Sequence, residues 1–399
     1  MKLSIKDTSH MKKMGALLLG ASMLTTQMAA ADSDNDKIKV MSRNIYLGAD
    51  IFPVIATAQQ QAELPPEQQN PLAIPLAVSE VFQTVQATNF PERAQALADE
   101  IERRRPHVIG LQEVSQWFIG PADSIVGGTS PASDVVYDYL DILMAALAER
   151  GLDYTVAASV DNADLELPMV TGTDETGYPT FADIRLHDRD VVLVKNNDNV
   201  SFSNEYSANF TTNGTTNVGG TEVEFTRGYN MIDVNVKGAD YRFVNTHLEV
   251  GGSEPFMSLQ AIQMNELTQV ITATTTPETP VILVGDFNSS PEDVPFESAF
   301  GLGTLYPPYL QAVGTGYNDI WMSKRKPKDG FTCCFSADVS DEEAELYSRI
   351  DHIFLDPKAR EIAKLKSKVV GDSNADMTDE SGLNPSDHAG VFGKIKLEK

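Results

Sequence analysis

Cysteine is nearly absent from this sequence: two occur among 399 residues, and they are neighbours, Cys333 and Cys334. One adjacent pair cannot form the disulfide framework that stabilises many small exported proteins, so the fold must depend on a hydrophobic core. The pair has three states open to it, namely free buried thiols, a vicinal disulfide or part of a soft-metal site. Neighbouring cysteines rarely bond and no matching His spacing is present, so we expect free buried thiols.

Long hydrophobic runs are also missing. No stretch approaches the roughly 18 to 20 apolar residues that a membrane-spanning helix needs, so no transmembrane segment is expected. The N-terminus instead carries four lysines within its first 13 residues, a short apolar run at Met14–Leu24 and the small residues Ala29–Ala31. This pattern predicts a signal peptide over residues 1–31 and a secreted or periplasmic protein.

Positive charge is scarce: 31 Lys and Arg stand against 57 Asp and Glu, for a formal net charge of -26. Such a chain repels phosphate backbones and has no general surface for nucleic-acid binding. Cleavage of nucleic acid at one local cleft is not excluded, since divalent metals and a few basic side chains can offset the field there.

The remaining composition is that of a globular protein, with 42% hydrophobic residues. We find no repeat and no linker, so residues 32–399 are predicted to form one mixed α/β domain. A segment at about 47–88 is rich in Gln, Ala and Pro and is interpreted as an insertion. Its prolines argue against one continuous helix, and its apolar residues must pack on the body of the domain or over a cleft.

Short apolar runs predict the strands, and helical spacing predicts the helices. Predicted helices cover Asp134–Arg150 and Met257–Thr272, and another begins at Asn89 and stops before Pro106. The segment Asn213–Gly220 is predicted to be a loop. The predicted strands are Ile38–Met41, Val108–Leu111, Tyr154–Ser159, Val191–Lys195, Val223–Phe225, Met231–Val236, Tyr241–Asn245, Val281–Val284, Ile350–Leu355 and Val391–Ile395.

Polar, charge-bearing groups recur at the ends of these strands. A single case has a simple structural explanation, because strands must end and polar residues cap them. Several such groups rich in Asp, Asn, Glu and His instead indicate a site at one rim of a sheet. The groups are Ser42-Arg43-Asn44, Leu111-Gln112-Glu113, Asn245-Thr246-His247-Leu248, Gly285-Asp286-Phe287-Asn288, Arg349-Ile350-Asp351 and Ser386-Asp387-His388.

In this order the motifs resemble those of the endonuclease/exonuclease/phosphatase superfamily of metal-dependent phosphoesterases. The resemblance extends from Ser42 to His388. It implies an α/β fold in which two mixed β-sheets pack together between outer helices, a four-layer α/β sandwich with its cleft at one end.

The resemblance and the chemistry of phosphoryl transfer imply the same catalytic roles. His388 would be the general base, because imidazole titrates near working pH, and Asp351 would orient it. Asp286 and Asn288 would hold the attacking water and a phosphate oxygen.

Carboxylate oxygens are the ligands that hard divalent cations prefer, so Glu113 is the best candidate ligand for Mg²⁺, with Mn²⁺ as a substitute. Asn44 would lie beside Glu113 as a ligand or phosphate contact, and Asp387 would complete the metal surroundings.

His247 would protonate the leaving oxygen or stabilise the charged phosphate. Asp190 is a candidate to orient His247, and Arg227 resembles a phosphate-contacting position. His107, His187 and His352 belong to no catalytic motif and are interpreted as structural.

The expected function is Mg²⁺-dependent hydrolysis of a phosphodiester by His-activated water attack. The substrate is nucleic acid or a lipid or small phosphodiester, as in a sphingomyelinase or phospholipase C. A phosphomonoesterase and a non-catalytic binding protein on the same fold are the alternatives, and no obligate protein partner is inferred.

Overall fold

The computed structural model describes residues 37–128, 130–323, 328–341, 343 and 345–398. The predicted signal peptide, residues 1–31, lies outside them. Within these described residues, no helix is long and apolar enough to cross a membrane.

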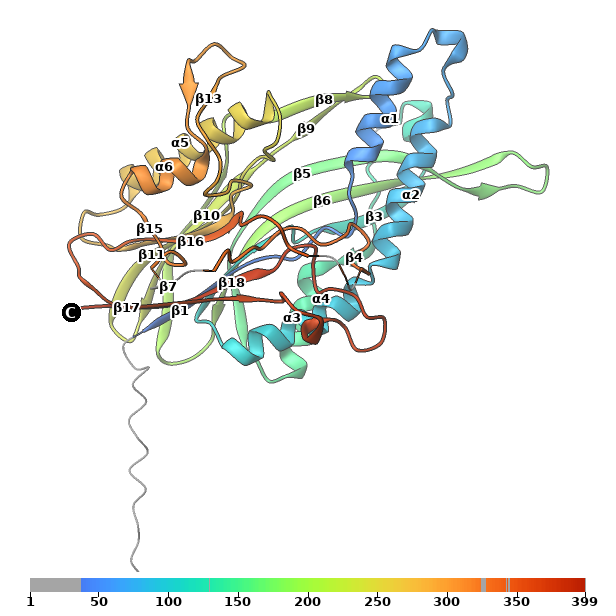
Figure 1. The fold of residues 1–399 in the computed structure, drawn as a ribbon. Coiled ribbons are helices and arrows are strands. Elements are labelled where there is room, and N and C mark those ends of the chain that lie inside the picture. The colour runs from blue at the N-terminus through green and yellow to red at the C-terminus, as the bar shows by residue number, and fades with distance from the viewer. Residues whose placement is uncertain (1–36, 129, 324–327, 342, 344, 399) are drawn as a thin grey trace, which may run out of the picture. The chain divides into compact units, whose positions relative to one another are not determined.

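Most of the described strands form two large sheets, and many of them are labelled in Figure 1. The larger sheet has the order β17 (Ile362–Val370), β18 (Gly390–Leu397), β1 (Ile38–Asn44), β2 (Val108–Gln112), β6 (Pro179–Lys195), β3 (Gln116–Pro121) and β4 (Asp134–Asp138), with β5 (Tyr154–Thr173) also paired to β6. The smaller sheet has the order β15 (Asn318–Asp319), β16 (Asp351–Asp356), β12 (Val281–Asp286), β11 (Ala239–His247), β10 (Gly228–Val236) and β7 (Val200–Asn209).

The two sheets pack face to face through alternate residues of their central strands. Val40 and Val108 from the larger sheet share one buried cluster with Phe243, Ile282 and other residues of the smaller sheet. The neighbouring residues on each strand point the opposite way, as the two-residue period of a strand requires. Each sheet therefore buries both faces, which explains the nearly continuous apolar runs in the sequence.

Helices cover the outer face of each sheet. Met41 and Ile109 of the larger sheet pack in one cluster with α1 (Phe52–Glu63), α2 (Ala73–Ala87), α3 (Phe90–Arg104) and α4 (Tyr139–Glu149). Leu283 of the smaller sheet packs in another with α5 (Phe256–Thr274) and α6 (Pro308–Gly314). The arrangement is helix, sheet, sheet, helix, so the predicted four-layer α/β sandwich is confirmed.

Short 3₁₀ helices and two hairpins complete the described elements. They are the 3₁₀ helices Pro66–Gln68, Ser124–Val126 and Asn374–Asp376, the hairpin of β8 (Gly214–Val218) and β9 (Thr221–Phe225), and the hairpin of β13 (Phe296–Glu297) and β14 (Thr304–Leu305).

Three predictions from the sequence are corrected by the structure. The predicted helix over Asp134–Arg150 begins only at Tyr139, because residues 134–138 form β4 and pair with β3. The predicted loop over Asn213–Gly220 contains β8, which pairs with β9. Strands β5 and β6 extend well beyond their predicted apolar portions, because their outer parts pair with each other and so need little burial.

Asp138 marks the true start of α4. Its carboxylate accepts hydrogen bonds from the backbone N–H groups of Leu140 and Asp141, and it pairs with Arg189 at 2.8 Å. Replacement of Asp138 by Ala removes this cap, so the free energy of unfolding should fall by about 1–2 kcal/mol. Urea denaturation measures this loss, and Asp141→Ala, in the first turn of the same helix, is the control. A loss below about 0.3 kcal/mol would contradict a capping role.

The proline-rich segment at about 47–88 forms α1 and α2 rather than one helix. Pro53 lies in the first turn of α1, Pro66 begins the 3₁₀ turn that follows, and Pro75 lies in the first turn of α2. Proline is tolerated at these positions because the N–H groups of a first turn have no partner inside the helix. Both helices pack against the outer parts of β5 and β6 (Figure 1).

Candidate active site

The predicted site residues meet at one end of the two sheets because strand register aligns them. Asn44, the last residue of β1, lies opposite Gln112 on the parallel strand β2, and Glu113 follows. In the smaller sheet His247 lies opposite Asp286, which lies opposite Asp351. Three motifs distant in sequence therefore become one row across β11, β12 and β16.

Two backbone features fix the polar residues at the strand ends. Glu113 and Asn288 have φ values of 59° and 49°, in the left-handed region that non-glycine residues rarely adopt. Such conformations concentrate at functional sites, where the surrounding fold maintains them. Gly285 precedes Asp286 with φ 155°, and a Cβ at this position would lie 2.0 Å from the carbonyl oxygen of Thr246. Glycine is thus required where β12 approaches β11.

His388 and Asp351 form a buried hydrogen-bonded pair. The distance from His388 Nδ1 to Asp351 Oδ2 is 2.8 Å, and the other ring nitrogen, Nε2, lies 3.7 Å from Asp286 Oδ2. Burial acts to lower the pKa of His388, but the carboxylates of Asp351, Asp387 and Asp286 raise it well above its usual value. The geometry leaves Nε2 as the reactive nitrogen, facing the same carboxylate as His247.

Asp286 lies at the centre of the site. Its Oδ2 accepts a hydrogen bond from Asn44 Nδ2 at 3.1 Å and lies 3.5 Å from His247 Nε2. Its Oδ1 accepts the backbone N–H of Asn288 at 2.9 Å. Burial, followed by repulsion from Asp351, raises the pKa of Asp286 to about 6.

Two donor groups lie beside the ring of His247. Arg227 Nη1 lies 3.1 Å from His247 Nδ1, and Asn288 Nδ2 lies 3.2 Å from Nε2. A guanidinium can only donate, so Nδ1 accepts and a neutral ring carries its proton on Nε2, toward Asp286 at 3.5 Å. Asn288 Nδ2, itself a donor, then donates to the carbonyl oxygen of Leu248 at 3.1 Å rather than to Nε2. Burial and the charges of Arg227 and His388 lower the pKa of His247 well below its usual value. This neutral ring is suited to donate a hydrogen bond to a phosphate oxygen.

Asp190, the candidate to orient His247, is buried in β6 next to that ring. Its carboxylate, that of Asp188 and a ring nitrogen of His247 lie within 4.8 Å of one another. The nitrogens closest to the ring atoms of His247, however, belong to Arg227 and Asn288. Arg227 was predicted to contact phosphate. Its guanidinium contacts the ring of His247, and its Nη2 lies 3.6 Å from Glu249 Oε1.

Glu113 and Asp387 bring two carboxylates to the same cleft. Burial raises the pKa of Glu113 to about 7, with further contributions from the charges of Asp387 and Asp188. Burial also raises the pKa of Asp387. Clustered, desolvated carboxylates of this kind are stabilised by a hard divalent cation, so the donor set fits one. Asn44 lies beside them, but its Nδ2 donates to Glu113 at 3.0 Å and its Oδ1 accepts the N–H of Tyr46.

The cleft has a volume of about 330 Å³ and opens between the two sheets. Besides the predicted residues it is lined by Asp188 and Glu249, which sequence reasoning missed. Asp188 and Asp190 alternate on β6, and this D-x-D spacing was the available signal for Asp188. Glu249 follows the His247 motif by two residues, and no motif marked it.

Arg93 of α3 is a further residue that the sequence did not reveal. It is fully buried and donates to the carbonyl oxygens of Ile45 at 2.8 Å and Pro385 at 3.0 Å. The first of these carbonyls follows Asn44 and the second precedes Asp387. Arg93 therefore joins the two loops that carry the candidate metal ligands.

Cys334 lies in the wall of the cleft. Cys333 and Cys334 are joined in a vicinal disulfide, so the expectation of free thiols is wrong. Isolated β-bridges pair the backbone of Cys333 with that of Ser348 and with that of His388. The cysteine pair is therefore held next to the candidate base.

A protein-family model with the description "Endonuclease/Exonuclease/phosphatase family" matches residues 82–388. The chain belongs to this family. Members of the endonuclease/exonuclease/phosphatase family are metal-dependent phosphoesterases, so the chain is a metal-dependent phosphoric ester hydrolase. Asn44 and α1 precede the matched residues. The structure, rather than the family model, places Asn44 beside Asp286 and Phe52 of α1 at the cleft.

Solved structures similar to this family member share little sequence with it. Truncated TDP2 from Caenorhabditis elegans is 13% identical, with 90% of this chain and 97% of that chain covered and a TM-score of 0.45. An endonuclease/exonuclease/phosphatase protein from Beutenbergia cavernae is 18% identical, with coverages of 91% and 72% and a TM-score of 0.48. A mannosyl-6-phosphatase from Bacteroides thetaiotaomicron is 14% identical, with coverages of 91% and 100% and a TM-score of 0.46. No curated protein matches the chain.

Proposed function

We propose that the chain is an exported, Mg²⁺-dependent phosphodiesterase that activates water with His388. The observation that carries this proposal is the buried His388–Asp351 pair, whose free nitrogen faces Asp286 inside a cleft also lined by Glu113, Asp387 and Arg227. A base, an orienting carboxylate and a candidate cation site converge there, as phosphoryl transfer requires.

In the proposed reaction His388 Nε2 takes a proton from the attacking water, and Asp351 stabilises the imidazolium that results. Asp286, close to both imidazole rings, positions that water. Hydrogen bonds from His247 Nε2–H and Asn288 are directed toward the non-bridging oxygens, and Arg227 adds positive charge behind them. The bond from phosphorus to the leaving oxygen breaks as the bond to water forms, and the leaving oxygen takes a proton from solvent to depart as the alcohol.

Glu113 and Asp387 would hold the cation, with Asn44 beside them. Bound there, Mg²⁺ or Mn²⁺ supplies Lewis-acid stabilisation of the charge on the phosphate oxygens. Neutralisation of these carboxylates also removes part of the negative charge that raises the pKa of His388, which favours the neutral base.

Export rests on the sequence pattern of residues 1–31, with its basic start, short apolar run and small residues before Asp32. Expression of the full-length chain with cell fractionation tests it. A mature protein that begins near Asp32 outside the cytoplasm is expected, and an unprocessed cytoplasmic chain would contradict export.

Metal removal should abolish activity. The carboxylates of Glu113 and Asp387 are negative, so without the cation they cannot stabilise the charge on the phosphate oxygens. We expect EDTA to eliminate hydrolysis of bis-p-nitrophenyl phosphate, and excess Mg²⁺ or Mn²⁺ to restore it. The same assay on plasmid DNA, RNA, sphingomyelin, phosphatidylcholine and p-nitrophenyl phosphate separates the substrate classes. Activity confined to p-nitrophenyl phosphate would favour a phosphomonoesterase, and EDTA-resistant hydrolysis would contradict the cation site.

A further inference from the structure

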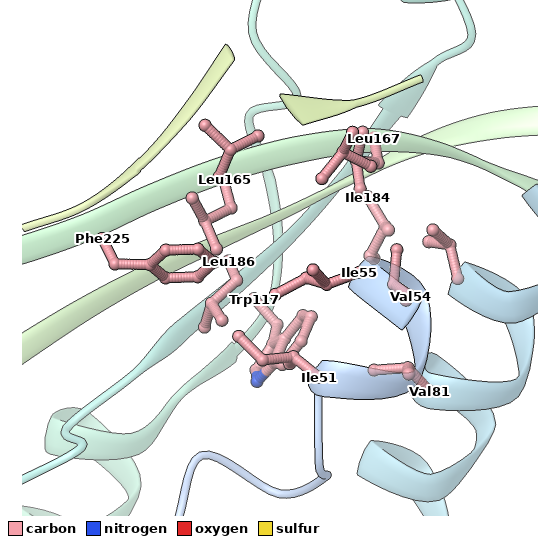
Figure 2. A pocket seen from close by; sticks show the side chains of 13 residues that line it. Ile51, Val54, Ile55, Val81, Trp117, Leu165, Leu167, Ile184, Leu186 and Phe225 are labelled. Carbon is pink, nitrogen blue, oxygen red and sulfur yellow. The ribbon is translucent and has the colours of Figure 1, made fainter. Parts of the chain in front are cut away.

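An apolar pocket adjoins the catalytic cleft, and none of the proposed chemistry uses it (Figure 2). All thirteen side chains that line it are Ile, Val, Leu, Phe or Trp. Its volume is about 60 Å³, room for roughly two methylene-sized groups if a water-sized group fills about 30 Å³. A ligand in this pocket gains no hydrogen bond, so it must be hydrocarbon.

Helices of the segment 47–88 close one side of the pocket. Val54 and Ile55 come from α1 and Val81 from α2, and they face the strand residues Leu167 and Ile184 across it (Figure 2). Trp117 of β3 also lines the pocket, and its indole N–H donates to the carbonyl oxygen of Leu47 at 2.9 Å. The polar edge of the ring is thereby satisfied, which leaves its apolar surface for a ligand.

The pocket lies directly beside the cleft, since four residues line both. Two of them lie two positions before polar residues of the cleft on the same segment: Leu186 before Asp188, and Phe225 before Arg227. The same short stretches of chain therefore supply the polar wall and the apolar wall. A hydrocarbon group in the pocket would be joined to a phosphate held in the cleft.

The charges of the cleft favour a lipid over nucleic acid. Among its described lining residues Arg227 is the sole Lys or Arg, whereas six are Asp or Glu: Asp50, Glu113, Asp188, Glu249, Asp286 and Asp387. A nucleic acid needs basic contacts to the phosphates that flank the cleaved one. A lipid phosphodiester has one phosphate and a hydrocarbon chain, and Phe52, which is 46% exposed at the cleft, extends the apolar surface outward.

We propose that this pocket binds a hydrocarbon chain of the substrate, so that the enzyme acts on lipid-type phosphodiesters. The proposal rests on the phosphodiesterase activity proposed above, and it assigns the segment 47–88 a role in substrate selection.

A series of methyl, butyl, hexyl and octyl p-nitrophenyl phosphates tests the proposal on the Mg²⁺-loaded enzyme. Burial of one methylene group improves binding about fourfold, so two buried groups predict a rise in kcat/KM of about 15-fold along the series, followed by a plateau. A thymidine p-nitrophenyl phosphate ester should be hydrolysed more slowly than the hexyl ester.

Ile55→Phe should fill the pocket and remove this dependence on chain length while leaving kcat/KM for the methyl ester unchanged. The matched control is Leu76→Phe, an exposed position on α2 outside the pocket, which should keep the full rise. The unchanged methyl-ester rate shows that Ile55→Phe is folded, and Val81→Phe replaces it if that rate is lost.

Binding without turnover provides a second measurement. Trp117 and Trp321 are the two tryptophans of the chain, so Trp321→Phe leaves Trp117 as the fluorescent reporter inside the pocket. Hexylphosphonate should change its emission and methylphosphonate should not.

The possible failures are distinguishable. No EDTA-sensitive hydrolysis of any ester would overturn the proposed phosphodiesterase. Normal hydrolysis with no effect of chain length on kcat/KM and no response of Trp117, or a preference for the thymidine ester, would overturn the lipid proposal alone.

Discussion

Replacement of His388 by Ala is expected to lower kcat on bis-p-nitrophenyl phosphate by roughly 10³- to 10⁴-fold, the upper part of the range for general acid–base catalysis. The variant loses the only nitrogen positioned by Asp351 and directed at Asp286 among the described residues. Asp351→Asn should lose less, roughly 10²-fold, because the base remains but its orientation and charge stabilisation weaken. Initial rates at saturating substrate and Mg²⁺ measure both.

His107→Ala is the matched control for His388→Ala. His107 lies at the opposite end of the same sheet from Asn44 and Glu113, where its ring Nδ1 accepts a hydrogen bond from the backbone N–H of Lys39 at 3.1 Å. Its loss should leave kcat within about twofold. Circular dichroism establishes that each variant is folded. A folded His388→Ala enzyme with near-normal turnover would eliminate His388 as the base.

Replacement of Glu100 by Leu is expected to lower the free energy of unfolding by about 3–5 kcal/mol. Glu100 and Arg43 form a salt bridge of 3.1 Å at which both side chains are 1% exposed. Burial raises the pKa of Glu100 and the charge of Arg43 opposes that shift. Without Glu100 the guanidinium keeps its charge in the core with no carboxylate beside it.

The double variant Arg43→Met/Glu100→Leu should recover most of this loss, because a buried ion pair often contributes little over an apolar pair. Glu102→Ala removes an exposed partner, that of Arg105, and should cost under about 0.5 kcal/mol. Urea unfolding curves for the unchanged protein and these three variants measure the free energies of unfolding. Equal losses of unfolding free energy for Glu100→Leu and Glu102→Ala would show that leaving Arg43 buried without its partner costs no more than removing an exposed partner.

The central strands and their polar ends could be predicted from the sequence because each is a short, uninterrupted apolar run followed by a motif. Val281–Val284 and Gly285-Asp286 are an example: both faces of β12 are buried, so its residues are all apolar, and the polar group begins where burial ends. The site residues at these ends were therefore found together with the strands.

Other features have no local signal. Asp188 and Glu249 enter the cleft through the pairing of strands far apart in the sequence, and Arg93 acts through carbonyl groups that could belong to any residue. β4 resembles the start of a helix because only its pairing with β3 determines its conformation. The apolar pocket arises where α1, α2 and five separate strands meet, which no single segment of sequence reveals.

The pairing of β1 with β18 has a consequence for biosynthesis. The first strand of the described chain pairs with the last, and His388 precedes that last strand by two residues. Until β18 has been made and has paired with β1, the candidate base His388 and the candidate metal ligand Asp387 are not held at the site, and β1 is paired with β2 alone. The candidate site therefore stays incomplete until this late strand joins the sheet.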